Sequence, residues 1–140
     1  MIGIGFVIVY LNLGSGITLH ATCDNWMKIF FDGKLAFEDT HYGKLLSSRP
    51  WQWEVQTAIE IPENTKTIGI ECQDAGVAKG IIASTSDGVV SNTLSWMCTP
   101  KQSVDWAKPG SLAPFYYPQS FGKNGVRPWG KRLGHNHDDN

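Results

Sequence analysis

The chain lacks a concentrated charge of either sign. Its 140 residues contain 12 Lys and Arg against 13 Asp and Glu, which gives a formal net charge of −1. No run of basic residues occurs anywhere in the sequence. Proteins that bind nucleic acids or anionic membrane surfaces normally carry clustered Lys and Arg. The composition therefore predicts no nucleic-acid partner and no membrane-surface partner.

Sequence motifs of the common catalytic sites are also lacking. We find no G-x-S-x-G elbow, no H-E-x-x-H pair, no phosphate-binding loop and no dinucleotide-binding glycine pattern. Carboxylates such as Glu38, Asp39, Glu54 and Glu60 are scattered, and their spacing does not select two of them as an acid/base pair. The sequence predicts a protein that is not an enzyme.

No apolar run is long enough to cross a bilayer as a helix. The run Met1–Leu13 has the length of the apolar core of a secretory signal peptide, and the small residues Gly14-Ser15-Gly16 suit cleavage. We therefore predict a signal peptide over residues 1–16 and a secreted, extracellular protein with no membrane span in its mature chain. The alternative is a buried first β-strand, because Val and Ile favour strands and no basic residue precedes the run.

Cysteine is scarce, at three residues, and none of the three lies in a C-x-x-C pair, which argues against a zinc site built on cysteines. In a secreted protein two of three cysteines would pair and one would be left over. We predict a disulfide between Cys72 and Cys98, with Cys23 free or paired outside this chain. The sequence also lacks an N-x-Ser/Thr site, so N-glycosylation gives no further evidence for secretion.

What the sequence does contain is a series of short strand-like segments separated by turns. Asp32-Gly33 lies between two apolar runs and is the strongest short-range hairpin signal, because both residues tolerate positive φ. Other turns are expected at Pro62-Glu63-Asn64 and Asp87-Gly88. The strands are expected over Ile17–Thr22, Trp26–Phe31, Lys34–Phe37, Trp51–Ile59, Thr67–Cys72, Gly80–Ser84 and Leu94–Cys98. This pattern predicts an all-β fold, an antiparallel β-sandwich or barrel with its core over residues 17–99.

Composition changes after Thr99. Residues 100–140 are rich in Pro and Gly, which favours extended, turn-rich chain over a second packed domain. We expect this C-terminal segment to pack on the sandwich or to extend it.

The run Ala21–Lys34, with its Asp24-Asn25 step and Asp-Gly hairpin, resembles the opening of a galactose-binding-like β-sandwich domain of the carbohydrate-binding-module type. Ile68–Cys72, Ser95–Cys98 and Phe121–Gly130 are similar to later parts of such domains. These domains occur in secreted invertebrate proteins and as accessory modules of glycoside hydrolases. The resemblance implies a jelly-roll sandwich, a glycan or glycoprotein as partner, and other domains in a longer parent protein.

Six Trp in so short a chain exceed what a small core needs, and surplus aromatics often lie at binding surfaces. Sugar sites combine an aromatic face with a few polar groups. The candidate ligand-binding residues are His41, Tyr42, Arg49, Trp51, Asp74, Trp106 and Tyr116. The alternatives are core packing for Trp residues on strands, including Trp51, Trp53 and Trp96, and an ordinary solvated loop for His41 and Tyr42.

Asp24 and Asn25 are candidate ligands for Ca²⁺, the one cofactor that the sequence suggests. A calcium site needs six to eight oxygens, however, and one such pair supplies few of them. The alternative is that the pair caps a turn through hydrogen bonds to the backbone. Together these features predict a lectin-like, non-catalytic extracellular module that binds carbohydrate. A structural or adhesive matrix module that binds protein or self-associates is the alternative.

Overall fold

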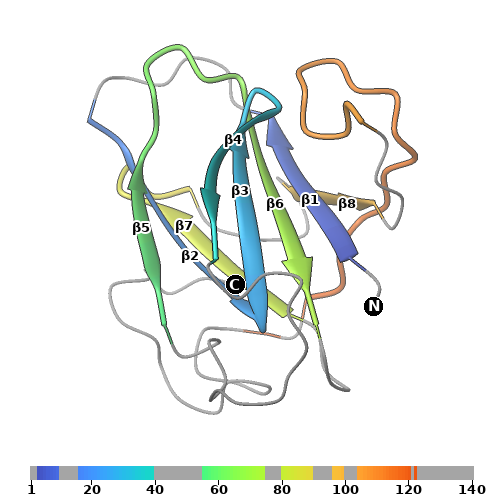
Figure 1. Cartoon of the computed structure of the whole chain (residues 1–140), viewed down its shortest axis with the longest axis horizontal. Coiled ribbons are helices and arrows are strands. Elements are labelled where there is room, and N and C mark those ends of the chain that lie inside the picture. Colours follow the sequence, from blue (N-terminus) through green and yellow to red (C-terminus); the bar gives the residue numbers. More distant parts are fainter. Residues whose placement is uncertain are drawn as a thin grey trace.

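The computed structural model describes residues 3–9, 16–39, 55–74, 80–89, 96–99, 104–120 and 122. The described residues form eight β-strands and no helix, so none of them belongs to a helix that could cross a membrane. The strands make two antiparallel sheets that pack as layers (Figure 1). The predicted all-β sandwich is confirmed.

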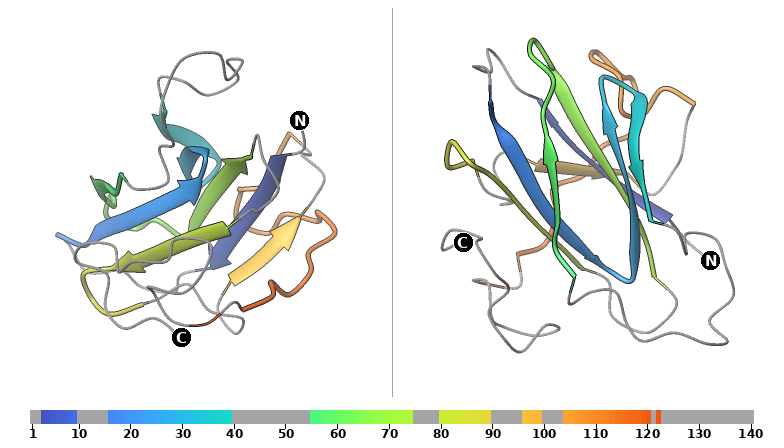
Figure 2. Two further views of the ribbon diagram at one scale, coloured as in Figure 1. Left: turned by 90° about the horizontal axis from the view of Figure 1, so that it is seen from below. Right: turned by 60° about the vertical axis from the view of Figure 1, so that its left-hand side comes forward.

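The larger sheet has five strands in the order β4-β3-β6-β1-β8, and the smaller sheet has three in the order β5-β2-β7. Figure 2 shows the two layers from two further directions. In chain order the strands are β1 Gly3–Val9, β2 Thr18–Asp24, β3 Trp26–Phe31, β4 Lys34–Glu38, β5 Thr57–Glu60, β6 Thr67–Gln73, β7 Gly80–Thr85 and β8 Trp96–Thr99.

The core lies between the sheets and is built by period-two alternation. On β2 the side chains of Leu19, Ala21 and Cys23 join it, and on β6 those of Ile68 and Ile70 do the same. Successive side chains of a strand point to opposite faces, so each strand gives every second residue to this layer. Burying one such Leu or Ile stabilises the fold by about 1.5–3 kcal/mol.

The Asp32-Gly33 turn joins β3 to β4 as predicted. Asp32 has φ 49° and Gly33 has φ 79°, the left-handed region that this dipeptide tolerates. The Asp32 carboxylate also reaches a neighbouring strand: its Oδ1 accepts hydrogen bonds from the backbone N–H groups of Lys66 and Thr67, at 2.9 and 2.8 Å. The residue therefore ties the hairpin to the start of β6.

The other two predicted turns are also confirmed. Asn64 has φ 65°, and the N–H of Thr65 donates to the carbonyl of Pro62 at 3.2 Å. After β7, Gly88 has φ 94° and its N–H donates to the carbonyl of Thr85 at 2.9 Å.

The segment Gly3–Val9, inside the predicted signal peptide, forms strand β1. Strand β1 lies between β6 and β8 and pairs antiparallel with both. Its pairing with β6 runs from Gly3 opposite Gln73 to Val9 opposite Thr67. This arrangement corresponds to the alternative interpretation, a first β-strand. Cleavage after residue 16 would leave β8 without its neighbour in the sheet. The signal peptide and the domain boundary at residue 16 stay predictions.

The predicted disulfide between Cys72 and Cys98 is wrong. Cys72 pairs with Cys23 instead, at a Cα–Cα distance of 5.9 Å, and Cys98 is the free cysteine. The reason is the sheet order, since β1 lies between β6 and β8 and separates their cysteines by two strand spacings. Two spacings amount to about 9–10 Å, beyond the reach of about 7 Å for a disulfide. The observed bond links β2 of the small sheet to β6 of the large one.

Part of the C-terminal segment packs on the outer face of the large sheet. Trp106 and Ala107 form a second, smaller apolar cluster with Phe30, and the rings of Phe30 and Trp106 meet edge to face with centroids 5.5 Å apart. The hydroxyl of Thr67 donates to the carbonyl of Ala107 at 2.7 Å. Beyond this cluster, Tyr116 forms an isolated antiparallel bridge with Cys98 on β8.

Candidate functional site

A cavity of about 280 Å³ opens at the flank of the sandwich where the edge strands of the two sheets lie. Strands β2 and β5 of the small sheet form one side, and β3 and β4 of the large sheet form the other. The described lining residues are Thr22, Cys23, Asn25, Met27, Phe37, Glu38, Asp39, Val55 and Thr57. The cavity therefore belongs to both layers, and the stacking of the two sheets creates it.

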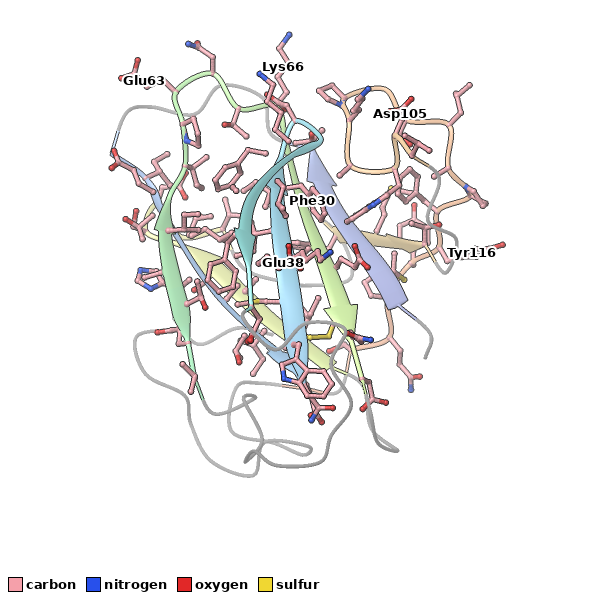
Figure 3. All side chains as sticks on the ribbon, in the orientation of Figure 1. Phe30, Glu38, Glu63, Lys66, Asp105 and Tyr116 are labelled. Atoms are coloured by element: carbon pink, nitrogen blue, oxygen red, sulfur yellow. A yellow bond between two sulfur atoms is a disulfide. The ribbon has the colours of Figure 1, made fainter. Side chains whose placement is uncertain are left out.

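The floor of the cavity is fixed by buried residues. Thr22, Cys23, Asn25 and Met27 are each less than 5% exposed. The backbone N–H of Asn25 donates to the carbonyl of Gln73 at 2.9 Å. The disulfide, drawn as a yellow bond in Figure 3, also belongs to this region because Cys23 is one of its two cysteines. These constraints preform the floor.

The mouth combines apolar and polar groups. Val55 is 56% exposed, and Phe37 is partly buried with one side against the core cluster. Thr57 adds a hydroxyl and Asp39 a carboxylate. This combination of apolar surface with a few polar groups is typical of small-molecule sites.

Two acidic residues, Glu38 and Asp39, lie at the mouth of the cavity. Phe37 lies opposite the fully buried Ile29, so its side chain belongs to the inner face of β4. Glu38 therefore faces outward, where it forms an ion pair with Lys28 at 3.4 Å. Asp39 follows β4 directly, and its N–H donates to the carbonyl of Met27 at 3.0 Å. Both acidic residues line the cavity, Glu38 as the last residue of β4 and Asp39 directly after it.

Asp24 and Asn25 lie at the junction of β2 and β3, beside the floor, and the peptide bond between them is cis. The amide nitrogen of Asn25 donates to Asp24 Oδ1 at 2.7 Å. Burial, and after it the charge of Asp74, raises the pKa of Asp24 from its ordinary 3.8 to about 6. The charged form of Asp24 is therefore disfavoured in the fold.

These oxygens do not make up a calcium site by themselves. No group of three or more His, Cys, Asp or Glu that could hold a metal occurs in the described part of the chain. Asp24, Asn25 and Asp74 supply carboxylate and amide oxygens of the right chemistry, but fewer than the six to eight that calcium takes. Calcium binding stays a prediction.

Three of the predicted ligand-binding residues are described, and none of them lines the cavity. Asp74 is buried next to the end of β6, close enough to Asp24 to affect its pKa. Trp106 is only 5% exposed and packs on Phe30, a position that argues for a structural role. Tyr116 is 57% exposed, but it lies beyond β8, at the opposite edge of the large sheet from β4 (Figure 3).

The other four candidates, His41, Tyr42, Arg49 and Trp51, lie outside the described residues. They belong to the segment 40–54, and the residues on either side of that segment, Asp39 and Val55, both line the cavity. Sequence reasoning missed Phe37, Asp39 and Thr57 as cavity residues. Strands containing Phe37 and Thr57 were predicted, and Asp39 follows the first of them closely, but no local signal indicates that the edges of two different sheets meet.

No family model matches this chain, and no curated protein matches it. Among solved structures, the fold is similar to part of an α-L-rhamnosidase from Streptomyces avermitilis, whose crystal structure was determined in complex with L-rhamnose. The TM-score is 0.74 at 19% sequence identity, over 94% of this chain and 14% of that one. The chain thus spans a small part of the length of the enzyme, and at this identity the likeness establishes the fold.

Proposed function

We propose that this protein is an extracellular, non-catalytic module that binds carbohydrate in the cavity between β4 and β5. The observation that carries the proposal is the cavity itself. Its floor of Thr22, Cys23, Asn25 and Met27 is buried. At its mouth, apolar Phe37 and Val55 lie beside polar Asp39 and Thr57. Sugar rings present apolar C–H faces and hydroxyl edges, and such a lining suits both.

The fold and the disulfide support the proposal. The similar fold is a part of a glycoside hydrolase, and the galactose-binding-like features of Ala21–Lys34 favour the same class of domain. The disulfide Cys23–Cys72 is compatible with an oxidising, extracellular location.

A binding role without catalysis fits the arrangement of the acidic groups at the mouth. Glycosidases use two carboxyl groups that flank the scissile bond. Here Glu38 and Asp39 are adjacent in the sequence and lie at the same side of the cavity, and Glu38 is held in an ion pair with Lys28. The two neighbouring carboxylates do not face each other across the cavity.

The experiment is a glycan-array screen of the full chain, with L-rhamnose and galactose among the sugars and with and without added calcium. Binding to one glycan class is expected, at about 0.1–1 mM for a single site. Calcium dependence would support the prediction for Asp24 and Asn25. A blank array from protein shown to be folded would contradict the proposal.

A pair of matched variants locates the site. Val55→Trp places a large side chain at the cavity mouth, whereas Val104→Trp makes the same change at a fully exposed position remote from the lining. We expect the first variant to lose glycan binding and the second to retain it. Equal binding by both would place the site elsewhere.

A second candidate function is a structural or adhesive matrix module, favoured by Cys98. This cysteine is free and partly exposed on β8, an edge strand of the large sheet. Burial raises the pKa of its thiol, which lowers the reactive thiolate fraction at neutral pH. Disulfide-linked dimers on a non-reducing gel, absent from Cys98→Ser, together with a blank glycan array would favour this function.

A further inference from the structure

We propose that Thr57 is the specificity-determining residue of the cavity, because its hydroxyl binds one hydroxyl group of a sugar whose C–H face lies on Phe37 and Val55. The inference rests on the proposed glycan-binding function and names the feature of the sugar that the site recognises. A site of this kind distinguishes sugars at one ring position and tolerates changes at the others.

Thr57 lines the cavity from a fixed strand. It is the first residue of β5 and lies opposite Ala21, which is fully buried in the core. Residues directly opposite each other in an antiparallel pair share a face of the sheet, so Thr57 belongs to the inner face. Ile59, two residues later, packs against the core cluster from the same face. The position of Thr57 in the lining is therefore set by strand pairing.

The hydroxyl of Thr57 is available for a ligand. It makes no hydrogen bond with any residue in the described part of the chain, and the residue is only partly buried. A threonine hydroxyl offers one donor and two acceptor positions, so it can bind a sugar hydroxyl in either direction. A ligand that bonds to Thr57 therefore breaks no hydrogen bond with these residues.

Other polar groups of the lining are already engaged. The side-chain nitrogen of Asn25 donates to Asp24 Oδ1 at 2.7 Å, and Glu38 forms its ion pair with Lys28 at 3.4 Å. A ligand that takes over such a group competes with an existing interaction, and the net gain is small because one bond replaces another. Thr57 gains a bond without this loss, so its contribution to specificity is larger.

Apolar side chains from both sheets lie beside Thr57 in the lining. Val55, two residues before it, is 56% exposed, and Phe37 comes from β4 with one side against the core cluster. Met27 of β3 supplies a buried apolar part of the floor. The C–H face of a sugar ring packs on such a surface and excludes water, and a hydrogen bond is stronger where water is excluded.

These apolar surroundings make a missing partner costly. When a ligand covers Thr57 but lacks the matching hydroxyl, the threonine hydroxyl is removed from water and left unpaired. Sugar hydroxyls that point to solvent at the mouth keep their bonds to water, so removing one of them changes the affinity little. Discrimination is therefore concentrated at one ring position.

The test uses the methyl glycosides of galactose, glucose and L-rhamnose, with the monodeoxy analogues of whichever binds, in NMR titrations of the full chain. In the unchanged protein, we expect one analogue to bind about tenfold more weakly than its parent glycoside and the others to bind within about threefold of it. In Thr57→Val the parent glycoside should bind about tenfold more weakly, and the sensitive analogue should bind as tightly as the parent glycoside. In Thr57→Ser, which retains the hydroxyl, the discrimination should survive.

Thr18→Val is the matched control. It makes the same change on the neighbouring strand β2, at a residue outside the described lining. Thr18 is on the outer face of the sheet, because the next residue, Leu19, belongs to the core. Its affinity and discrimination should stay within about twofold of the unchanged protein. Urea unfolding should find Thr57→Val as stable as the unchanged protein, since the substitution breaks no hydrogen bond to the described residues.

The outcomes separate the two proposals. If the folded protein binds none of the parent glycosides, both the glycan-binding function and this inference are contradicted. If it binds one of them and Thr57→Val leaves affinity and discrimination unchanged, the function stands and the inference is overturned. The inference is also overturned if Thr57→Val loses stability together with binding, which would assign Thr57 a structural role, or if Thr18→Val weakens binding equally.

Discussion

At the scale of single residues, Asp24 is the group, among the residues that the structure describes, whose pKa the fold shifts most clearly. Its pKa rises to about 6 from an ordinary 3.8, chiefly because burial penalises the charged form. A raised carboxyl pKa means that the folded protein binds more protons than the unfolded chain between these two values. Protonated Asp24 therefore stabilises the fold at low pH relative to the ionised form, and this stabilisation is lost as pH rises through about 6.

We predict that Asp24→Asn stabilises the protein above pH 6 relative to the parent, and that this gain disappears toward about pH 3.5. The gain should be about 1 kcal/mol after discounting for solvent screening. The asparagine still offers an oxygen to the amide of Asn25. Urea unfolding of both proteins across this pH range measures the difference.

Glu63→Gln, at an exposed turn residue, is the control for the removal of one negative charge. If the two substitutions show the same pH dependence, burial of Asp24 is not the cause.

At the scale of elements, the docking of the C-terminal segment on the large sheet depends on Gly69. A Cβ at this position would lie 2.6 Å from the Cβ of Ala107 and 3.0 Å from the ring of Trp106. Glycine weakens a strand by about 0.5–1 kcal/mol relative to alanine. Its presence in the middle of β6 is explained by this close approach of the segment.

We therefore predict that Gly69→Ala destabilises the protein by about 1–3 kcal/mol, although alanine is otherwise the better strand residue. The Trp106 ring should move away from Phe30, which tryptophan fluorescence and chemical denaturation can follow together.

The double variant Gly69→Ala with Ala107→Gly tests the cause. It removes the nearest contacting atom and should recover part of the lost stability. A Gly69→Ala protein as stable as the parent, with unchanged fluorescence, would contradict the proposed docking.

At the scale of the whole molecule, the disulfide Cys23–Cys72 joins the two sheets across the core. It closes a loop of 49 residues, and such a crosslink stabilises a protein by about 4 kcal/mol in the chain-entropy model. We predict that replacing both cysteines by Ala costs about this amount in urea unfolding, and that glycan binding weakens because Cys23 lines the cavity floor.

Cys98→Ala is the matched control and should cost little, since Cys98 is free and only partly buried. Peptide mapping under non-reducing conditions should recover a Cys23–Cys72 pair. A Cys72–Cys98 pair in that map, or a cost for Cys98→Ala equal to that of the double variant, would show that the sheets are linked differently.

Local chemistry allowed much of the fold to be predicted. Asp32-Gly33 forms its turn because the backbone preferences of these two residues act within the turn itself. The alternating runs around Leu19 and Ile70 become strands because their period matches the pleat. By the same local reasoning, Trp96 is a core residue, as its 2% exposure shows.

The candidate site was less accessible to prediction because it is a product of long-range pairing. The sequence cannot show that Phe37 and Asp39 on one sheet would face Thr57 on the other across a shared cavity. Trp106 gave an aromatic signal that looked like a binding residue, yet its ring is covered by a cluster on the outer face. An aromatic count is the same whether the rings contact a ligand or one another.

The sequence by itself determined the all-β class, the turns and most strand positions, because these follow from backbone preference and side-chain period over a few residues. Only the tertiary structure decided which cysteines pair and where a cavity opens. Both depend on the strand order: β1 separates Cys72 from Cys98, and the edges β4 and β5 come together only when the sheets stack. Strand order is set by the burial of the whole core, to which residues distant in the sequence contribute together.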